Sequence, residues 1–134
     1  MLTRDIVEPI LQEIKKHEGV DATAVVSRDG ILVGAEIPPE VHGETFAIMS
    51  ATMLGAAITA NSELNKNMPS KVIVESDDGF TIVAGAGINS ILVVSAKGTD
   101  KAKLLKGKYN TTTWNHFTGE DGRLFGETIR MGEG

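Results

Sequence analysis

Residues 45–62 read TFAIMSATMLGAAITANS, a run without one charged side chain in a protein in which charged residues make up 23%. Small and apolar residues occupy nearly every side of the helix that this run predicts, so the helix has no face suited to water. It must be covered on more than one side by its own sheet, by a second copy of the protein or by lipid. The kind of cover decides most of the fold and function.

A lipid bilayer is the least favoured of these covers. The run is rich in Thr, Ser, Ala and Gly, with Asn61 and Glu63 at its end, whereas a spanning helix needs about 20 strongly apolar residues. The first residues, MLTRDIVEPILQEIKK, place acids among apolar positions and lack the continuous apolar core of a secretory signal. We therefore expect no membrane insertion and a cytoplasmic protein.

The overall composition narrows the function classes. A chain of 134 residues predicts one domain with a core of its own. The net charge of -5 argues against nucleic-acid binding, which needs clustered Lys and Arg, and favours a protein partner. Because the chain has no cysteine, disulfides, thiolate nucleophiles and Cys-ligated metals are excluded.

The N-terminal segment predicts an amphipathic helix over residues 5–17. Its apolar face carries Ile6, Ile10 and Ile14 at a spacing of four residues. Pro9 is tolerated best in a first turn, so we expect regular helix to begin only at residue 7 or 8.

Five segments have the composition of strands: 20–27, 31–37, 71–75, 80–86 and 90–96. Short turns join them in pairs, including Asp29-Gly30, and connections this short force antiparallel pairing. The long helix, expected over residues 41–64, falls between the second and third strands. The predicted fold class is therefore α+β, with a single five-stranded antiparallel sheet and helices on its faces.

The C-terminal part has a different composition. Residues 99–108 predict a short third helix, whose basic residues favour a solvated face over a dock for an acidic partner or anionic lipid. We place the domain at 1–108 and a tail at 109–134. Within the tail, residues 121–129 repeat the pattern D-G-x-L-x-G-x-x-I of residues 29–37. This predicts either an extra β-hairpin packing on the domain or a chance similarity in a flexible tail.

Catalytic motifs are absent from the sequence. The three histidines, His17, His42 and His116, lack partners at metal-ligand spacing. A phosphate-loop match ending at Gly107-Lys108 fails because positions 102 and 109 are Ala and Tyr. We therefore expect no catalytic residue, no metal and no cofactor. Arg28, in a predicted turn, is the least poor candidate for an arginine finger, although turn arginines are usually solvated.

Two stripes follow the long helix. The stripe expected to lie on the sheet consists of Phe46, Met49, Met53, Ala57, Ala60 and Leu64. The other stripe consists of Ile48, Ala51, Gly55, Ile58 and Ser62. Its small residues let a second helix approach closely, so the preferred interpretation is dimerisation through this stripe. The alternative is a helix enclosed wholly within its own chain.

The ordered set of segments resembles the roadblock family of dynein light-chain-like proteins, in particular short prokaryotic members. The resemblance is carried by GVDATAVVSRDGILVGAEIP at 19–38, GAAITANSEL at 55–64 and KVIVESDDGFTIVAGAGINSILVVSA at 71–96. It implies a profilin-like, non-enzymatic scaffold that forms a homodimer through the long helix and the third strand, with one continuous sheet across the two-fold axis. The strand residues that this carries over are Val72, Ile73 and Val74.

The same resemblance implies small Ras-like GTPases as partners, docking on the exposed part of the long helix and its neighbouring loops. The polar candidates there are Glu44, Asn61, Glu63 and Lys66. The expected function is that of a dimeric scaffold or regulator that modulates the nucleotide state or localisation of such a GTPase. Two alternatives stay open: a small-ligand sensor of profilin- or PAS-like layout, which needs a cavity beside the sheet, and an enzyme without a recognisable motif.

The chain departs from the family pattern after its last predicted strand. Family members close with an apolar-periodic third helix, whereas residues 101–108 are short and basic. The tail at 109–134 either replaces that helix or occupies the partner surface and regulates access to it.

Overall fold

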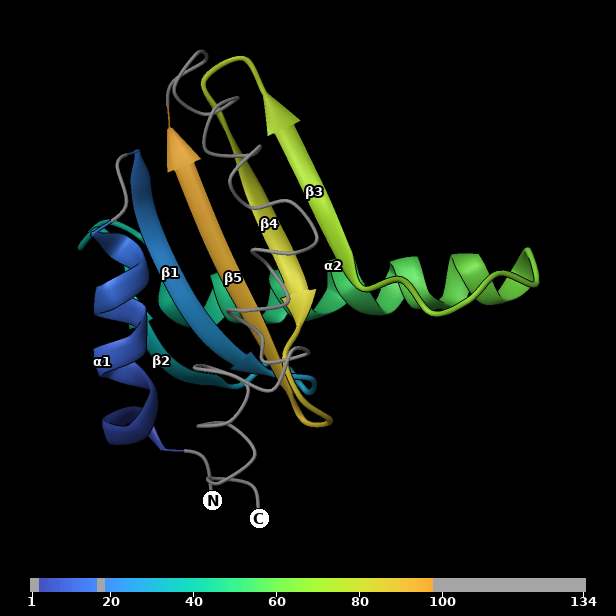
Figure 1. Ribbon diagram of the computed structural model, residues 1–134, viewed down its shortest axis with the longest axis horizontal. Helices are drawn as coiled ribbons and strands as arrows, with labels where there is room; N and C mark the ends of the chain where they lie inside the picture. Colours follow the sequence, from blue (N-terminus) through green and yellow to red (C-terminus); the bar gives the residue numbers. More distant parts are fainter. Residues whose placement is uncertain (1–2, 17–18, 98–134) are drawn as a thin grey trace.

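The computed structural model describes residues 3–16 and 19–97, which form two helices and five strands (Figure 1). The elements are α1 Arg4–Lys15, β1 Val20–Ser27, β2 Leu32–Glu36, α2 Gly43–Glu63, β3 Lys71–Ser76, β4 Gly79–Gly85 and β5 Ser90–Lys97. All strand pairs are antiparallel, in the order β2-β1-β5-β4-β3. The predicted fold class is confirmed. The third helix expected at 99–108 and the hairpin expected within 109–134 lie outside the described residues.

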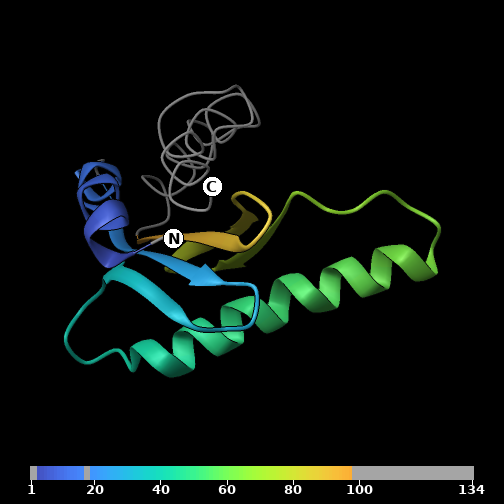
Figure 2. The same cartoon turned by 90° about the horizontal axis from the view of Figure 1, so that it is seen from below.

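The two helices lie on opposite faces of the sheet (Figure 2). On one face, Val7, Leu11 and Ile14 of α1 join the apolar residues of β4 and β5 in one buried cluster. The buried Thr23 hydroxyl of β1 donates a hydrogen bond of 3.3 Å to the Leu11 carbonyl oxygen, which ties this strand to α1. On the other face, α2 covers a second cluster built from alternate residues of the same strands.

Pro9 does not delay the start of α1, contrary to the sequence expectation. The helix begins at Arg4, and Pro9 lies inside it. The backbone N–H groups of Ile6 and Val7 already donate to the Thr3 carbonyl at 3.1 and 3.2 Å, so the first turn closes ahead of the proline. Asp5 and Pro9 are both exposed. Water can therefore satisfy the Asp5 carbonyl, which the proline leaves without an intrahelical donor.

The face of α2 that lies on the sheet also differs from the expected stripe. The buried residues are Ala47, Ser50 and Leu54, while Met49 and Leu64 of the expected stripe are 51% and 64% exposed. Ala60 of that stripe is exposed as well, whereas Phe46 and Met53 pack at the flank of the buried cluster. An uncharged helix offers no polar face to orient it, so its sequence did not identify the buried side.

Candidate interaction surface

Helix α2 is longer than the sheet beneath it. Its C-terminal part continues past β3, the outermost strand on that side (Figures 1 and 2). Every fully buried residue of α2 lies between Ala47 and Leu54, and none follows in the remaining nine residues to Glu63. Those last residues span about 13 Å at 1.5 Å per residue. The uncharged helix is therefore open to solvent over its second half.

Strand β3 is an unprotected edge next to this helix. It pairs with β4 from Lys71 to Ser76, and no strand within residues 3–16 and 19–97 pairs with its other side. Val72 packs against the cluster under α2, whereas Ile73 is 37% exposed and pairs with Ile82, whose side chain belongs to the cluster under α1. An exposed apolar edge of this kind is a template for pairing with another strand.

Exposed apolar side chains concentrate on α2 and β3. We define the α2–β3 surface by Ile48, Met49, Gly55, Leu64, Ile73 and Val74. All of these except the glycine are among the large hydrophobic residues that the described part of the chain exposes, with exposed fractions from 37% to 64%. Single exposed apolar residues are ordinary, but a group of them on adjacent elements marks an interaction site.

The residues predicted for a dimer interface fall on the flank of α2. Ile48, Gly55 and Ser62 are exposed, and nothing lies within 4 Å of the position that a Cβ would occupy at Gly55. Ala51 and Ile58 are half-buried against the cluster under the helix. The stripe is therefore accessible along one side, and its role in dimerisation stays a prediction.

The four polar candidates for partner binding do not form one cluster. Glu44 lies in the first turn of α2, and Asn61, Glu63 and Lys66 lie at its other end. The 17 residues from Glu44 to Asn61 correspond to about 26 Å of helix. These residues can contact one partner only if that partner spans most of the helix.

Asn61 has a structural task that the sequence did not indicate. Its side-chain amide donates to the Asn67 carbonyl at 3.1 Å, and its own carbonyl accepts from the Lys66 N–H at 2.9 Å. Asn65 between them adopts a positive φ of 56°, a conformation that asparagine tolerates better than most residues. Asn61 therefore holds the reversal of the chain after α2.

Arg28 is also more than a solvated turn residue. Its Nε donates to the Ile88 carbonyl at 2.8 Å, and its Nη2 donates to the Gly87 carbonyl at 3.1 Å. Its backbone N–H donates to the Asn89 carbonyl at 3.0 Å. A Cβ at Gly85 would lie 2.7 Å from Nη2, so this glycine leaves room for the guanidinium. Arg28 thus fastens the β4–β5 turn to the β1–β2 turn.

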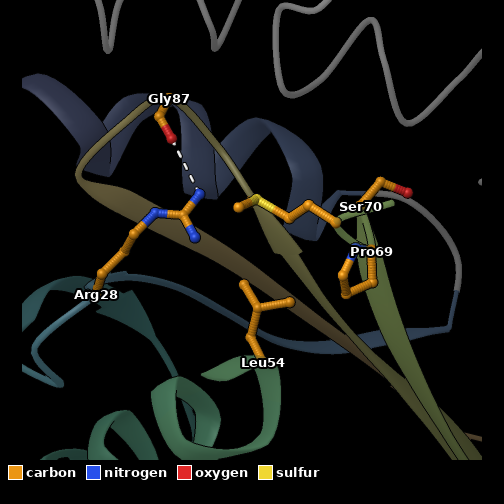
Figure 3. A pocket seen from close by; sticks show the side chains of 7 residues that line it. Arg28, Leu54, Pro69, Ser70 and Gly87 are labelled. Carbon is orange, nitrogen blue, oxygen red and sulfur yellow. Dashed lines mark hydrogen bonds between the residues drawn. The ribbon is translucent and has the colours of Figure 1, made fainter. Parts of the chain in front are cut away.

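A pocket of about 240 Å³ opens beside Arg28 (Figure 3). Arg28 and Gly87 lie on one side, Pro69 and Ser70 on the opposite side, and Leu54 of α2 closes the bottom. A second hollow, of about 130 Å³ and mostly polar, contains Asp21 and Ser76. Both are smaller than the roughly 300–1,000 Å³ typical of pockets for small-molecule ligands. This size gives little support to the ligand-sensor alternative within the described part of the chain.

The carboxylates at the β3–β4 turn are explained by local hydrogen bonding. The Ser76 hydroxyl donates to Asp78 Oδ1 at 2.6 Å. This bond, together with one from the Asp78 backbone N–H, lowers the pKa of the Asp78 carboxyl below its usual value of 3.8. Among residues 3–16 and 19–97, no group of three or more His, Cys, Asp or Glu side chains could hold a metal ion. In the same ranges, no helix is both long and apolar enough to span a membrane.

A family model described as Roadblock/LC7 domain matches residues 6–96. An uncharacterized protein of Methanocaldococcus jannaschii, MJ0714, is 28% identical over 93 residues, which cover 69% of this chain and 78% of the relative.

Two solved structures share the fold. The gliding protein MglB of Thermus thermophilus aligns with a TM-score of 0.72 at 18% identity, covering 97% of this chain and 90% of that one. A structure of MglB in a tetrameric arrangement aligns with a TM-score of 0.65 at 16% identity, covering 82% of this chain and 86% of that one.

Proposed function

We propose that this chain, which belongs to the Roadblock/LC7 domain family, is a non-enzymatic dimeric scaffold that binds a small Ras-like GTPase and modulates its nucleotide state or localisation. The α2–β3 surface carries this proposal, because an uncharged helix overhangs an unpaired apolar strand there. Neither element is suited to remain in water. The family resemblance implies both the mode of dimerisation and the class of partner.

A two-fold axis beside β3 accounts for both exposed elements at once. Two β3 strands that pair edge to edge satisfy each other's free backbone groups and continue the sheet from one protomer to the other. The overhanging half of α2 then lies over the sheet of the second protomer, where its exposed apolar residues gain cover. A stable interface of this kind buries about 1,200–2,000 Å² in total.

The partner would dock on what the dimer leaves open. Glu44 near one end of α2, and Glu63 and Lys66 near the other, are exposed charges around an uncharged centre. An apolar centre with a polar rim is the usual anatomy of a protein interface. The MglB structures support the fold of such a scaffold, and the GTPase itself is our proposal from the family resemblance.

The proposal is tested by capturing partners of the tagged protein from a lysate of its source organism, in parallel with a GTP analogue and with GDP, and identifying them by mass. Recovery of a small GTPase is the expected result, and a difference between the two nucleotides would mean that the scaffold distinguishes nucleotide states. Recovery of only further copies of the chain would leave the dimer in place and argue for the ligand-sensor alternative.

A further inference from the structure

A second group of exposed apolar residues lies away from the α2–β3 surface, at the end of the sheet where the β1–β2 and β4–β5 turns meet. Ile31 and Ile88, at these two turns, are 65% and 83% exposed, and Met68, before β3, is 71% exposed. We call Arg28, Ile31, Met68 and Ile88 the turn-end surface. Arg28 joins its parts, because it bonds to the Ile88 carbonyl and lines the pocket together with Met68.

Arg28 is held in place while part of its guanidinium stays available. Two of its five N–H donors are used on the carbonyls of Gly87 and Ile88. Among residues 3–16 and 19–97, the one ion pair joins Arg4 and Glu8, so Arg28 has no carboxylate partner there. An arginine fixed in this way loses little further side-chain entropy when it binds a carboxylate, the group that its planar fork fits best.

The adjoining pocket suits one apolar side chain. Its bottom is Leu54, which is 1% exposed, and Met68 and Pro69 add apolar surface at its wall. Its volume of about 240 Å³ is below the range of pockets for whole small-molecule ligands. A single large side chain that enters from a partner is the better match, and a buried anchor of this sort is how many protein interfaces gain affinity.

We propose that the turn-end surface binds a segment of a protein partner that presents a large apolar side chain next to a carboxylate. The apolar side chain enters the pocket over Leu54, and the carboxylate accepts hydrogen bonds from the free N–H groups of Arg28. The negative net charge of the chain, -5, makes this fixed cation a local exception and so a selective contact for an acidic segment. The inference does not depend on dimerisation or on the GTPase.

A peptide titration tests the proposal on the full chain. The ¹⁵N-labelled protein is titrated with acetyl-Leu-Glu-amide while the backbone amide signals are followed by NMR. We expect saturable shifts at Ser70, Gly85 and Gly87. Acetyl-Leu-Gln-amide and acetyl-Gly-Glu-amide should each bind about tenfold more weakly, because one lacks the charge and the other lacks the anchor. Equal binding of the three peptides, or shifts confined to other regions, would overturn the proposal.

Three variants separate the site from the fold. Arg28→Ala removes the cation but also loosens the two turns, so its loss of binding alone decides nothing. Met68→Ser changes a side chain that is 71% exposed and should leave the fold intact while weakening acetyl-Leu-Glu-amide about fivefold through the lost apolar contact. Arg4→Gln, on α1, should bind as the native protein does. Native-like binding by Met68→Ser and Arg28→Ala together would contradict the assignment.

Discussion

Leu54 and Gly55 are neighbours on α2 and meet opposite surroundings. Leu54 is 1% exposed against the sheet, whereas nothing lies within 4 Å of the place where a side chain at Gly55 would begin. The helix therefore has a closed and an open side although its sequence is uncharged on both. This difference makes α2 an element of the core and of a candidate interface at the same time, and it allows the two roles to be tested separately.

Replacement of Ser50 tests the closed side of α2. Its hydroxyl is fully buried and has no hydrogen-bond partner in the structure. We expect Ser50→Ala to raise the free energy of unfolding by about 1 kcal/mol, because it removes a buried unsatisfied polar group and improves helix propensity. Urea denaturation measures the change. Thr23→Val is the matched control, since it removes a buried hydroxyl that does donate to the Leu11 carbonyl, and it should destabilise by about 1 kcal/mol.

Gly30 is the position where the β1–β2 turn most requires glycine. Its φ is +91°, and a Cβ there would lie 3.2 Å from the Ile48 Cα, which belongs to the helix backbone. Gly30→Ala should therefore lower the free energy of unfolding by more than about 1 kcal/mol.

Gly55→Ala is the control for that substitution. The site is helical and open, so alanine there should stabilise the protein by about 0.5–1 kcal/mol. Thermal unfolding of both variants measures the difference. Equal effects of the two substitutions would mean that the Gly30 turn is not strained in the way the structure indicates.

The Ser76–Asp78 hydrogen bond gives a prediction about pH. The lowered pKa of Asp78 means that folding favours its ionised form, so this small contribution to stability is complete above pH 3.8 and is lost as the pH falls through the lower pKa of the folded state. Ser76→Ala should raise the Asp78 pKa towards its usual value, because the first cause of the shift is removed. Ser76→Thr, which keeps a hydroxyl, should leave it low. NMR titration of the Asp78 carboxyl distinguishes these outcomes.

The order of the elements could be predicted from the sequence, because it depends on local signals. The Asp29-Gly30 turn and the alternation in residues 20–27 indicate a hairpin wherever they occur. The buried side of α2 could not be predicted, since an uncharged helix carries no such signal. The role of Arg28 also escaped prediction, because it depends on the carbonyls of Gly87 and Ile88, 59 and 60 residues further along the chain.

Deletion of residues 109–134 tests the two roles left open for the tail. If the tail takes the place of the family's third helix, the shortened protein should lose cooperative unfolding. If the tail occupies the partner surface, the shortened protein should fold and capture its GTPase in larger amounts. Circular dichroism on heating and the capture experiment decide between these results. A fully folded protein with unchanged capture would contradict both roles.

The central claim is dimerisation through the α2–β3 surface, and the molar mass in solution of the native protein and of Gly55→Glu tests it most directly. Light scattering after size-exclusion chromatography should give the native protein twice the chain mass of 14.2 kDa. Gly55→Glu should give a folded monomer, because a charge buried without a partner in the interface costs several kcal/mol. The same dimer mass for both proteins, with unchanged circular dichroism, would contradict the claim and move the interface away from this side of α2.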